Sequence, residues 1–577
     1  MYSFKEVRKA SKLEINGAEY RVAVLGNCAT QLLTTALLGY AKLENINLSV
    51  YDADYDQIDT QLLDHNSETY KFQPGFILLY LSTERLYEEF MRSGIEERAK
   101  FADIMMSKID HYWNLILNNC NARILQMNFT EINDRILGNY SAKISISFIY
   151  QIRRLNYLLE ERMAQRNEIY PVDLLSIQIL LGSDVFFNPA MYYNTKMTID
   201  LNVLPYVAEN IVDILKAVQG KIKKCVVLDL DNTLWGGIIG DDGLAGIEVG
   251  ELGRGHAFTD FQLWLRQLKE RGILLAVCSK NNEEIAKEPF EKHSEMTLRL
   301  SDISIFVANW EDKASNIKWI QKNLNIGMDS MVFIDDSSFE RELVKSMIPE
   351  ITVPELPEDP AEYLTYLQNL NLFETVSYSS EDKDRTRQYQ AEFKRKELEQ
   401  EFNSIDDYLK GLEMIGEVRV FDSLSYSRIA QLTQRSNQFN LRTVRYTEDD
   451  IQRIAMDERY VALYYTLRDK FGDHGIVAVT ILEKRSSTEL FIDTLLMSCR
   501  VLKRGMEEFI MNKLVDVARN GGYKTIRAEY IPTSKNTMVK DLYSTMGFTV
   551  MQDFQYLLDI EKYITKTHYI KEGMENE

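Results

Sequence analysis

Two aspartates stand directly after a short apolar run near the middle of the chain. Residues 225–228 (CVVL) predict a buried strand, and Asp229 and Asp231 follow it. Ligand sites of open α/β sheets lie at the carboxyl ends of the strands. There Asp229 can attack phosphorus as a carboxylate nucleophile. Asp231 can act as general acid to the leaving oxygen and then as base for water. The alternative is that these aspartates only cap a helix.

Three further places in the chain offer the groups that this chemistry needs. Ser279 and the pair Asp335–Asp336 each end another apolar run, and Lys313 begins a helical stretch. We expect Ser279 to donate a hydrogen bond to a phosphoryl oxygen and Lys313 to offset negative charge. Carboxylates that face a phosphate repel it, so a divalent cation is required, and Mg²⁺ prefers such oxygen ligands. The predicted metal ligands are Asp229, Asp231, Asp335 and Asp336.

The elements that must position these residues alternate between strands and helices, which predicts an α/β fold. The predicted strands cover residues 21–25, 75–80, 122–129, 225–228, 274–279, 331–334, 418–421, 461–467, 475–483 and 489–499. The predicted helical stretches cover residues 30–43, 84–118, 147–167, 313–323, 425–438 and 506–521. The last group of strands and helices, beyond residue 405, predicts a mixed α+β unit.

The length of 577 residues predicts several domains. Residues 381–401 hold many acidic and basic residues and no Gly or Pro, which predicts a solvated helix between two domains. The predicted division is an N-terminal domain over 1–205, a central domain over 206–375, a charged helical linker over 376–405 and a C-terminal domain over 406–577.

Composition excludes several classes of function. The net charge of −20 disfavours a nucleic-acid binder and an anionic membrane surface as partner. No apolar run of about 18 residues and no apolar signal segment appear, so no membrane association is expected. Five cysteines without CxxC spacing indicate reduced thiols, and we therefore expect a cytoplasmic protein.

The order and spacing of Asp229, Ser279, Lys313 and Asp335 resemble the four motifs of the haloacid-dehalogenase (HAD) superfamily. The run LDLDNTLWGGIIGDDGLAGI resembles its FkbH-like branch more narrowly, as do ANWEDK from residue 308 and FIDDSSFER from residue 333. The resemblance implies an SGNH-like α/β domain, a HAD Rossmann-like parallel sheet with a minimal cap, and a GNAT-like mixed α+β domain.

The resemblance also implies an activity. This is Mg²⁺-dependent hydrolysis or transfer of a phosphoryl group from a small molecule through an aspartyl-phosphate on Asp229. In the best-known case the substrate is 1,3-bisphosphoglycerate and a glyceryl unit is loaded onto an acyl carrier protein. The alternative is a small-molecule or sugar phosphatase of surface-polysaccharide metabolism, whose flanking domains only bind partners.

The flanking domains depart from their family patterns. Cys28 stands where SGNH hydrolases have the nucleophilic serine, and no Asp-x-x-His follows, so Cys28 is either a packed residue or a nucleophile. In the central domain, Ser337 and Ser338 replace the usual Asn-Pro after Asp335 and Asp336.

The C-terminal segment from residue 500 to 505 resembles the pyrophosphate loop of GNAT enzymes, but Lys503 replaces its first glycine. The resemblance implies a site for CoA or phosphopantetheine, with Tyr543 either a general acid or a packing residue. The implied residues are Arg500, Lys503, Arg504, Gly505, Asn536 and Tyr543.

Overall fold

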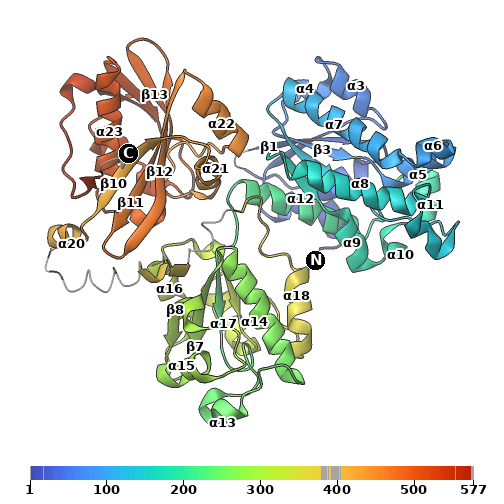
Figure 1. Ribbon diagram of the computed structural model, residues 1–577, viewed down its shortest axis with the longest axis horizontal. Helices are drawn as coiled ribbons and strands as arrows, with labels where there is room; N and C mark the ends of the chain where they lie inside the picture. The colour runs from blue at the N-terminus through green and yellow to red at the C-terminus, as the bar shows by residue number, and fades with distance from the viewer. Residues whose placement is uncertain are drawn as a thin grey trace. The chain divides into compact units, whose positions relative to one another are not determined.

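The computed structural model divides into two compact units, Met1–Lys216 and Ala217–Glu577 (Figure 1). It describes residues 2–573 except Gly17, Ala18, Asn403, Asp553 and most of 379–401. Within 379–401 the described residues are Thr386, Arg387, Tyr389, Gln390, Ala391 and Arg395. The predicted charged helix over 376–405 therefore lies largely outside the described residues. The predicted boundary at residue 205 falls at the start of helix α12, and the four-part division of the chain stays a prediction.

The first unit is built on a parallel five-stranded sheet in the order β2-β1-β3-β4-β5. Its strands are β1 (Tyr20–Gly26), β2 (Leu48–Asp52), β3 (Phe76–Tyr80), β4 (Arg123–Met127) and β5 (Ile169–Val172). Its helices are α1 (Phe4–Ala10), α2 (Gln31–Leu43), α3 (Ile58–Leu63), α4 (Glu68–Lys71), α5 (Thr83–Arg92), α6 (Ile95–Arg98), α7 (Phe101–Asn119), α8 (Phe148–Met163), α9 (Leu174–Leu181), α10 (Ser183–Phe186), α11 (Pro189–Thr195) and α12 (Leu204–Val218). The helices bury the sheet, which explains why β3 is an unbroken apolar run.

The second unit begins with a parallel four-stranded sheet in the order β8-β7-β6-β9. Its strands are β6 (Cys225–Leu228), β7 (Leu274–Ser279), β8 (Ile303–Ala308) and β9 (Met331–Ile334). Its helices are α13 (Ile239–Gly246), α14 (Arg254–Glu270), α15 (Glu283–Lys292), α16 (Lys313–Leu324), α17 (Ser338–Met347) and α18 (Tyr363–Asn369). Because β6 pairs with β7 and β9 in parallel, the carboxyl ends of all three meet at one edge.

The connection from β6 to α14 is short and contains only one helix, α13, which is interrupted at Gly243 with a φ of 65°. The buried side chain of Gln262 on α14 holds this connection in place. Its Nε2 donates to the Leu234 carbonyl at 2.7 Å, and its Oε1 accepts from the backbone of Thr297 at 3.0 Å. Residues 229–253 are all described, and they contain no separate cap domain. The small number of residues in this connection predicts this result.

A mixed eight-stranded sheet follows in the order β15-β16-β14-β13-β12-β11-β10-β17. Its strands are β10 (Ile415–Val420), β11 (Tyr460–Asp469), β12 (Gly472–Lys484), β13 (Glu489–Met497), β14 (Thr525–Glu529), β15 (Thr549–Gln552), β16 (Gln555–Asp559) and β17 (Lys571–Glu572). Its helices are α20 (Ile405–Gly411), α21 (Tyr426–Arg435), α22 (Glu448–Met456), α23 (Met506–Asn520) and α24 (Leu542–Thr545). The α/β class with parallel and mixed sheets is therefore confirmed.

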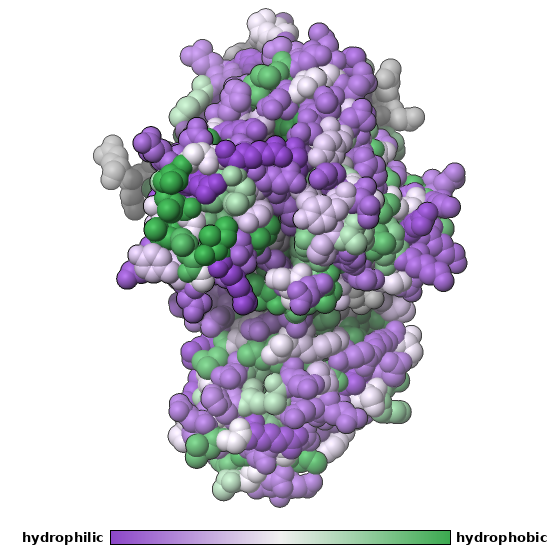
Figure 2. Space-filling model, turned by 90° about the vertical axis from the view of Figure 1, so that its right-hand side faces the viewer, coloured by the Kyte–Doolittle hydropathy of each residue, from purple (hydrophilic) through white to green (hydrophobic). Residues whose placement is uncertain are grey.

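One face of the molecule is largely hydrophilic. On the face seen in Figure 2, hydrophilic side chains predominate and apolar ones gather in scattered patches. Among the described residues, no single helix combines the length and the apolar composition that a membrane span requires. One bent pair, α9 with the segment Ser183–Thr195, meets these criteria only when both parts are counted together across a bend of 112°.

Candidate active site

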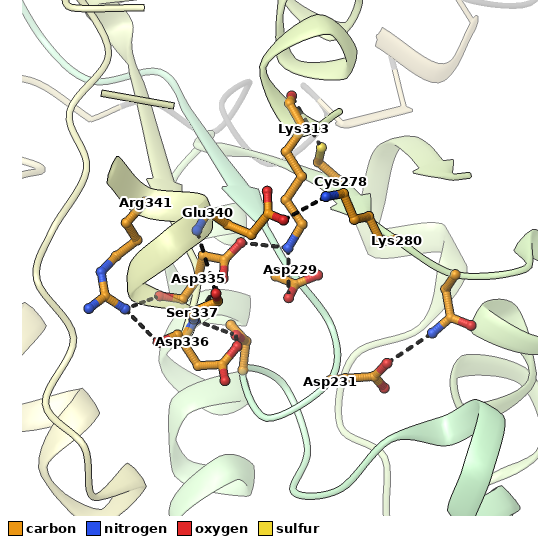
Figure 3. Close-up of polar contacts among 12 residues, drawn as sticks. Asp229, Asp231, Cys278, Lys280, Lys313, Asp335, Asp336, Ser337, Glu340 and Arg341 are labelled. Atoms are coloured by element: carbon orange, nitrogen blue, oxygen red, sulfur yellow. Dashed lines mark hydrogen bonds and ion pairs between the residues drawn. The ribbon is translucent and has the colours of Figure 1, made fainter. Parts of the chain in front are cut away.

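Three aspartates converge where β6 and β9 end. Leu228 pairs with Ile334 in the parallel register, so Asp229 and Asp335 follow at the same level, and the Asp229 N–H donates to the Ile334 carbonyl at 3.0 Å. One carboxylate oxygen each from Asp229, Asp335 and Asp336 lies within 4.8 Å of the others (Figure 3). The two strands that deliver them are fully buried apolar runs, which fixes the position of this edge.

Burial makes this group of carboxylates electrostatically costly. Asp335 is fully buried and Asp229 is 7% exposed. Burial, reinforced by the negative charge of Asp229, raises the pKa of Asp335 to about 7. Burial likewise raises the pKa of Asp336, again with a contribution from Asp229. The ionised group therefore needs positive charge close to it.

Lys313 supplies one positive charge at the centre. It is the first residue of α16, which begins with an N-cap from Asp312 to the Ser315 N–H at 2.8 Å. Its Nζ lies 2.9 Å from Asp229 Oδ2 and 2.6 Å from Asp335 Oδ2. Burial by itself would lower the pKa of Lys313, but Asp229 and Asp335 outweigh it and raise that pKa.

The donor set fits a divalent cation. Three carboxylates face one ammonium group, which leaves uncompensated negative charge at a buried site. Asp229 Oδ1 is buried and has no hydrogen-bond partner among the described residues. Oxygen-only ligands of this kind suit a hard divalent ion. Asp229, Asp335 and Asp336 are the residues that could hold it.

Asp231 is held apart from these three carboxylates. Its Oδ1 accepts hydrogen bonds from Trp235 Nε1 and from the Ile239 N–H, both at 3.0 Å, and its Oδ2 accepts from Asn281 Nδ2 at 3.0 Å. Figure 3 shows Asp231 apart from the other labelled aspartates. Burial raises its pKa. The structure thus does not bring the Asp231 carboxylate into the group that could bind a cation, although it was predicted as a fourth ligand. Its setting suits a residue that exchanges protons.

Ser279 lies at the same edge of the sheet. It is the last residue of β7, which pairs with β6, and it is almost fully buried. Its carbonyl accepts from the Asn309 N–H at 3.2 Å, which ties the ends of β7 and β8 together. The predicted residues Asp229, Ser279, Lys313, Asp335 and Asp336 therefore all lie at the edge where β6, β7 and β9 end.

Two residues that support the aspartates were missed in the sequence. The buried Arg341 on α17 donates from one guanidinium nitrogen to the carbonyls of Asp335, at 2.8 Å, and Asp336, at 2.6 Å. Thr233 Oγ1 accepts from the Asp336 N–H at 3.1 Å. Both lie inside the motifs quoted above, but only the folded backbone shows which carbonyl or amide each one contacts.

We predict that Arg341→Met lowers the free energy of unfolding by about 2–4 kcal/mol, because it removes two hydrogen bonds from a charged donor and leaves two carbonyls of the site loop unpaired. Urea denaturation followed by circular dichroism measures this. Arg459→Met, at an exposed arginine, is the control and should change stability by less than about 0.5 kcal/mol. Equal stability of the two variants would contradict the supporting role of Arg341.

The residues implied for a CoA-type site mostly make internal contacts. Arg504 is buried, and its guanidinium lies 3.2 Å from His474 Nε2 and 3.5 Å from Asp469 Oδ2. The Lys503 N–H, which a phosphate could use, donates to Glu507 Oε1 at 3.4 Å. Gly505, with a φ of 79°, precedes α23. Arg500 forms part of the short 3-10 turn Cys499–Val501.

Asn536 and Tyr543 are buried as well. The Asn536 amide accepts from the Thr533 N–H at 2.7 Å and donates to the Asn440 carbonyl at 3.0 Å, so it braces two loops. Tyr543 is 1% exposed, and its hydroxyl has no hydrogen-bond partner among the described residues. Burial raises its pKa. These contacts assemble no phosphate-binding group, and the CoA-type role of the six residues stays a prediction.

Cys28 follows β1 and is a packed thiol. It is 1% exposed, and the Thr198 hydroxyl lies 3.7 Å from its sulfur. Burial raises the pKa of Cys28 to about 12, so the thiolate is scarce at neutral pH. This setting favours the packing role over the nucleophilic role.

A family model and a solved structure each match a large part of the chain. A family model described as the FkbH N-terminal domain matches residues 21–216. The crystal structure of the N-terminal part of protein BF1531 from Bacteroides fragilis, which contains a phosphatase domain and was solved as a complex with Mg, is 45% identical in sequence. It matches at a TM-score of 0.63 and covers 66% of this chain and 100% of that chain.

Two further structures match only about a quarter of the chain. The ribosomal-protein-S18-alanine N-acetyltransferase from Escherichia coli is 16% identical, with a TM-score of 0.21, and the match covers 25% of this chain and 94% of that chain. The spermidine N-acetyltransferase from Vibrio cholerae is 11% identical, with a TM-score of 0.21, and the match covers 26% of this chain and 98% of that chain. Among curated proteins, none matches the sequence. The SGNH-like and GNAT-like assignments stay predictions.

Proposed function

The chain belongs to the FkbH-type family of proteins with a HAD-like phosphatase domain, and from this premise we propose that it is a Mg²⁺-dependent phosphohydrolase or phosphotransferase with Asp229 as nucleophile. The observation that carries the proposal is the group formed by Asp229, Asp335, Asp336 and Lys313 at one edge of the sheet. The Mg in the related Bacteroides structure agrees with the oxygen-only donor set here.

Asp229 and Asp231 carry out the chemical steps of the proposed reaction. A carboxylate oxygen of Asp229 attacks the phosphorus of a phosphate ester, and the bond from phosphorus to the leaving oxygen breaks. Asp231 gives the leaving oxygen its proton and then takes a proton from the water that attacks the aspartyl-phosphate. That second attack breaks the phosphorus–Asp229 bond and releases phosphate.

The remaining residues orient the reactants and balance charge. Lys313 holds Asp229 and Asp335 through the ion pairs described above. Trp235, Ile239 and Asn281 fix the Asp231 carboxylate. Mg²⁺ held by Asp229, Asp335 and Asp336 would offset their charge and polarise the phosphoryl group.

We predict that Asp229→Asn lowers kcat by at least about 10³-fold on any phosphorylated substrate that the wild type turns over with Mg²⁺, since the amide cannot attack phosphorus. Phosphate release from a panel of sugar, glyceryl and aryl phosphates measures this. Asp241→Asn is the matched control, because Asp241 lies on α13 outside the carboxylate group. Wild-type turnover by Asp229→Asn would contradict the proposal.

At a finer level we propose the glyceryl-loading reaction, in which 1,3-bisphosphoglycerate is the phosphorylated substrate and an acyl carrier protein receives the glyceryl unit. The family resemblance supports this, and so does the short β6–α14 connection, because a site without a cap domain leaves room for a macromolecular partner.

Incubation of the full chain with Mg²⁺, 1,3-bisphosphoglycerate and a carrier protein bearing its phosphopantetheine tests this finer proposal. We expect intact mass spectrometry to show a glyceryl unit on the carrier with the wild type, and none with Asp229→Asn. Phosphate release without any gain in carrier mass would favour the alternative, a phosphatase of small molecules or sugars.

A further inference from the structure

A second lysine lies beside the candidate site in a setting unlike that of Lys313. Lys280 follows Ser279 directly at the carboxyl end of β7, and its Nζ lies 2.6 Å from Glu340 Oε1 (Figure 3). The Lys280 side chain is 37% exposed, whereas that of Lys313 is 4% exposed. Lys280 therefore borders the accessible side of the site, and Lys313 occupies its buried centre.

Glu340 is placed to hold this lysine. It lies on the first turn of α17, three residues after the N-cap residue Ser337, and α17 begins two residues after Asp336. Its carboxylate is 10% exposed, and Oε2 is buried with no hydrogen-bond partner among the described residues. Burying a carboxylate is costly unless it is paired. Lys280 is the cation that the structure gives it, so the pair anchors the ammonium group beside Ser279.

The two lysines differ in what they can offer a ligand. Lys313 already contacts two carboxylates, Asp229 and Asp335, and is enclosed. Lys280 contacts one carboxylate, and an ammonium group has three N–H donors. Its partly exposed side chain can therefore contact an anion while it remains paired with Glu340.

We propose that Lys280 binds an anionic group on the leaving part of the substrate, so that the site selects phosphate esters whose leaving group carries a second negative charge. This inference rests on the proposed function. In this proposal the transferred phosphoryl group lies at Asp229, which Lys313 contacts, and the leaving group extends toward the more exposed side chain of Lys280. A fixed cation there favours a carboxylate or second phosphate over a neutral group.

The experiment compares kcat/KM for two esters that differ in one group, 2-phosphoglycolate with a carboxylate and 2-hydroxyethyl phosphate with a hydroxyl. The wild type should prefer phosphoglycolate by about tenfold or more, and Lys280→Gln should lower this ratio about tenfold. Lys280→Arg, which keeps the charge, should retain most of the preference. Lys292→Gln, which removes an exposed paired lysine on α15, should leave the ratio at the wild-type value.

The possible outcomes test the role of Lys280 and the proposed function separately. A wild type that shows no preference for phosphoglycolate, or a preference that survives in Lys280→Gln, would overturn this inference alone. A wild type that releases no phosphate from p-nitrophenyl phosphate, from either ester or from 1,3-bisphosphoglycerate with Mg²⁺ would overturn the proposed function, and this inference with it. Circular dichroism confirms that each variant is folded, so that a lost preference reports on Lys280 itself.

Discussion

Mutual repulsion among three carboxylates at one edge of a parallel sheet is the constraint around which the central site is built. Asp229, Asp335 and Asp336 approach one another because two adjacent buried strands end at the same level. Burial and the negative charge of Asp229 both raise the pKa values of Asp335 and Asp336. Lys313 offsets part of the charge, and Arg341 secures the loop that carries two of the aspartates. In the proposed function a divalent cation held by Asp229, Asp335 and Asp336 supplies the rest of the compensation.

The fold separates the roles of the acidic residues by backbone geometry. Asp229 is the first residue beyond β6 and enters the carboxylate group. Asp231, two residues later, is turned toward Trp235, Ile239 and Asn281. One short segment thus presents a carboxylate that faces the cation site and another held by hydrogen bonds for proton transfer. The difference lies in their neighbours, because both residues are aspartate.

The sequence was sufficient to predict the centre of the site. Continuous apolar runs at 225–228 and 331–334 predict strands buried on both faces, and the acidic residues after them must meet at one edge. Lys313 was predictable because it begins a helical stretch, and its spacing from Ser279 and Asp335 resembles that of the HAD motifs. The Lys280–Glu340 pair was not, since it joins residues 60 positions apart in sequence through side chains whose directions depend on packing. The same holds for the Arg341 contacts with backbone carbonyls.

Elsewhere, sequence patterns were less informative. The amphipathic stretch at 84–118 is divided into α5, α6 and α7, because the C-cap residue Ser93 and the N-cap residue Gly94 separate α5 from α6. Seven of the described strands were not predicted, namely β2, β5, β8, β14, β15, β16 and β17. Among them, β5 (Ile169–Val172) is short and contains a proline. In the C-terminal domain, the motif around Arg504 did not indicate that this arginine is buried and contacts Asp469 and His474.

The central claim is that Asp229, Asp335 and Asp336, and not the Asp231 side chain, hold the cation. Calorimetric titration of Mg²⁺ into the metal-free full chain tests it most directly, with the wild type compared with Asp335→Asn, Asp336→Asn and Asp231→Asn. We expect Mg²⁺ to bind to the wild type and to Asp231→Asn, and to bind at least about tenfold more weakly to each of the other two variants. Unchanged binding in Asp335→Asn and Asp336→Asn, or its loss in Asp231→Asn alone, would contradict the account.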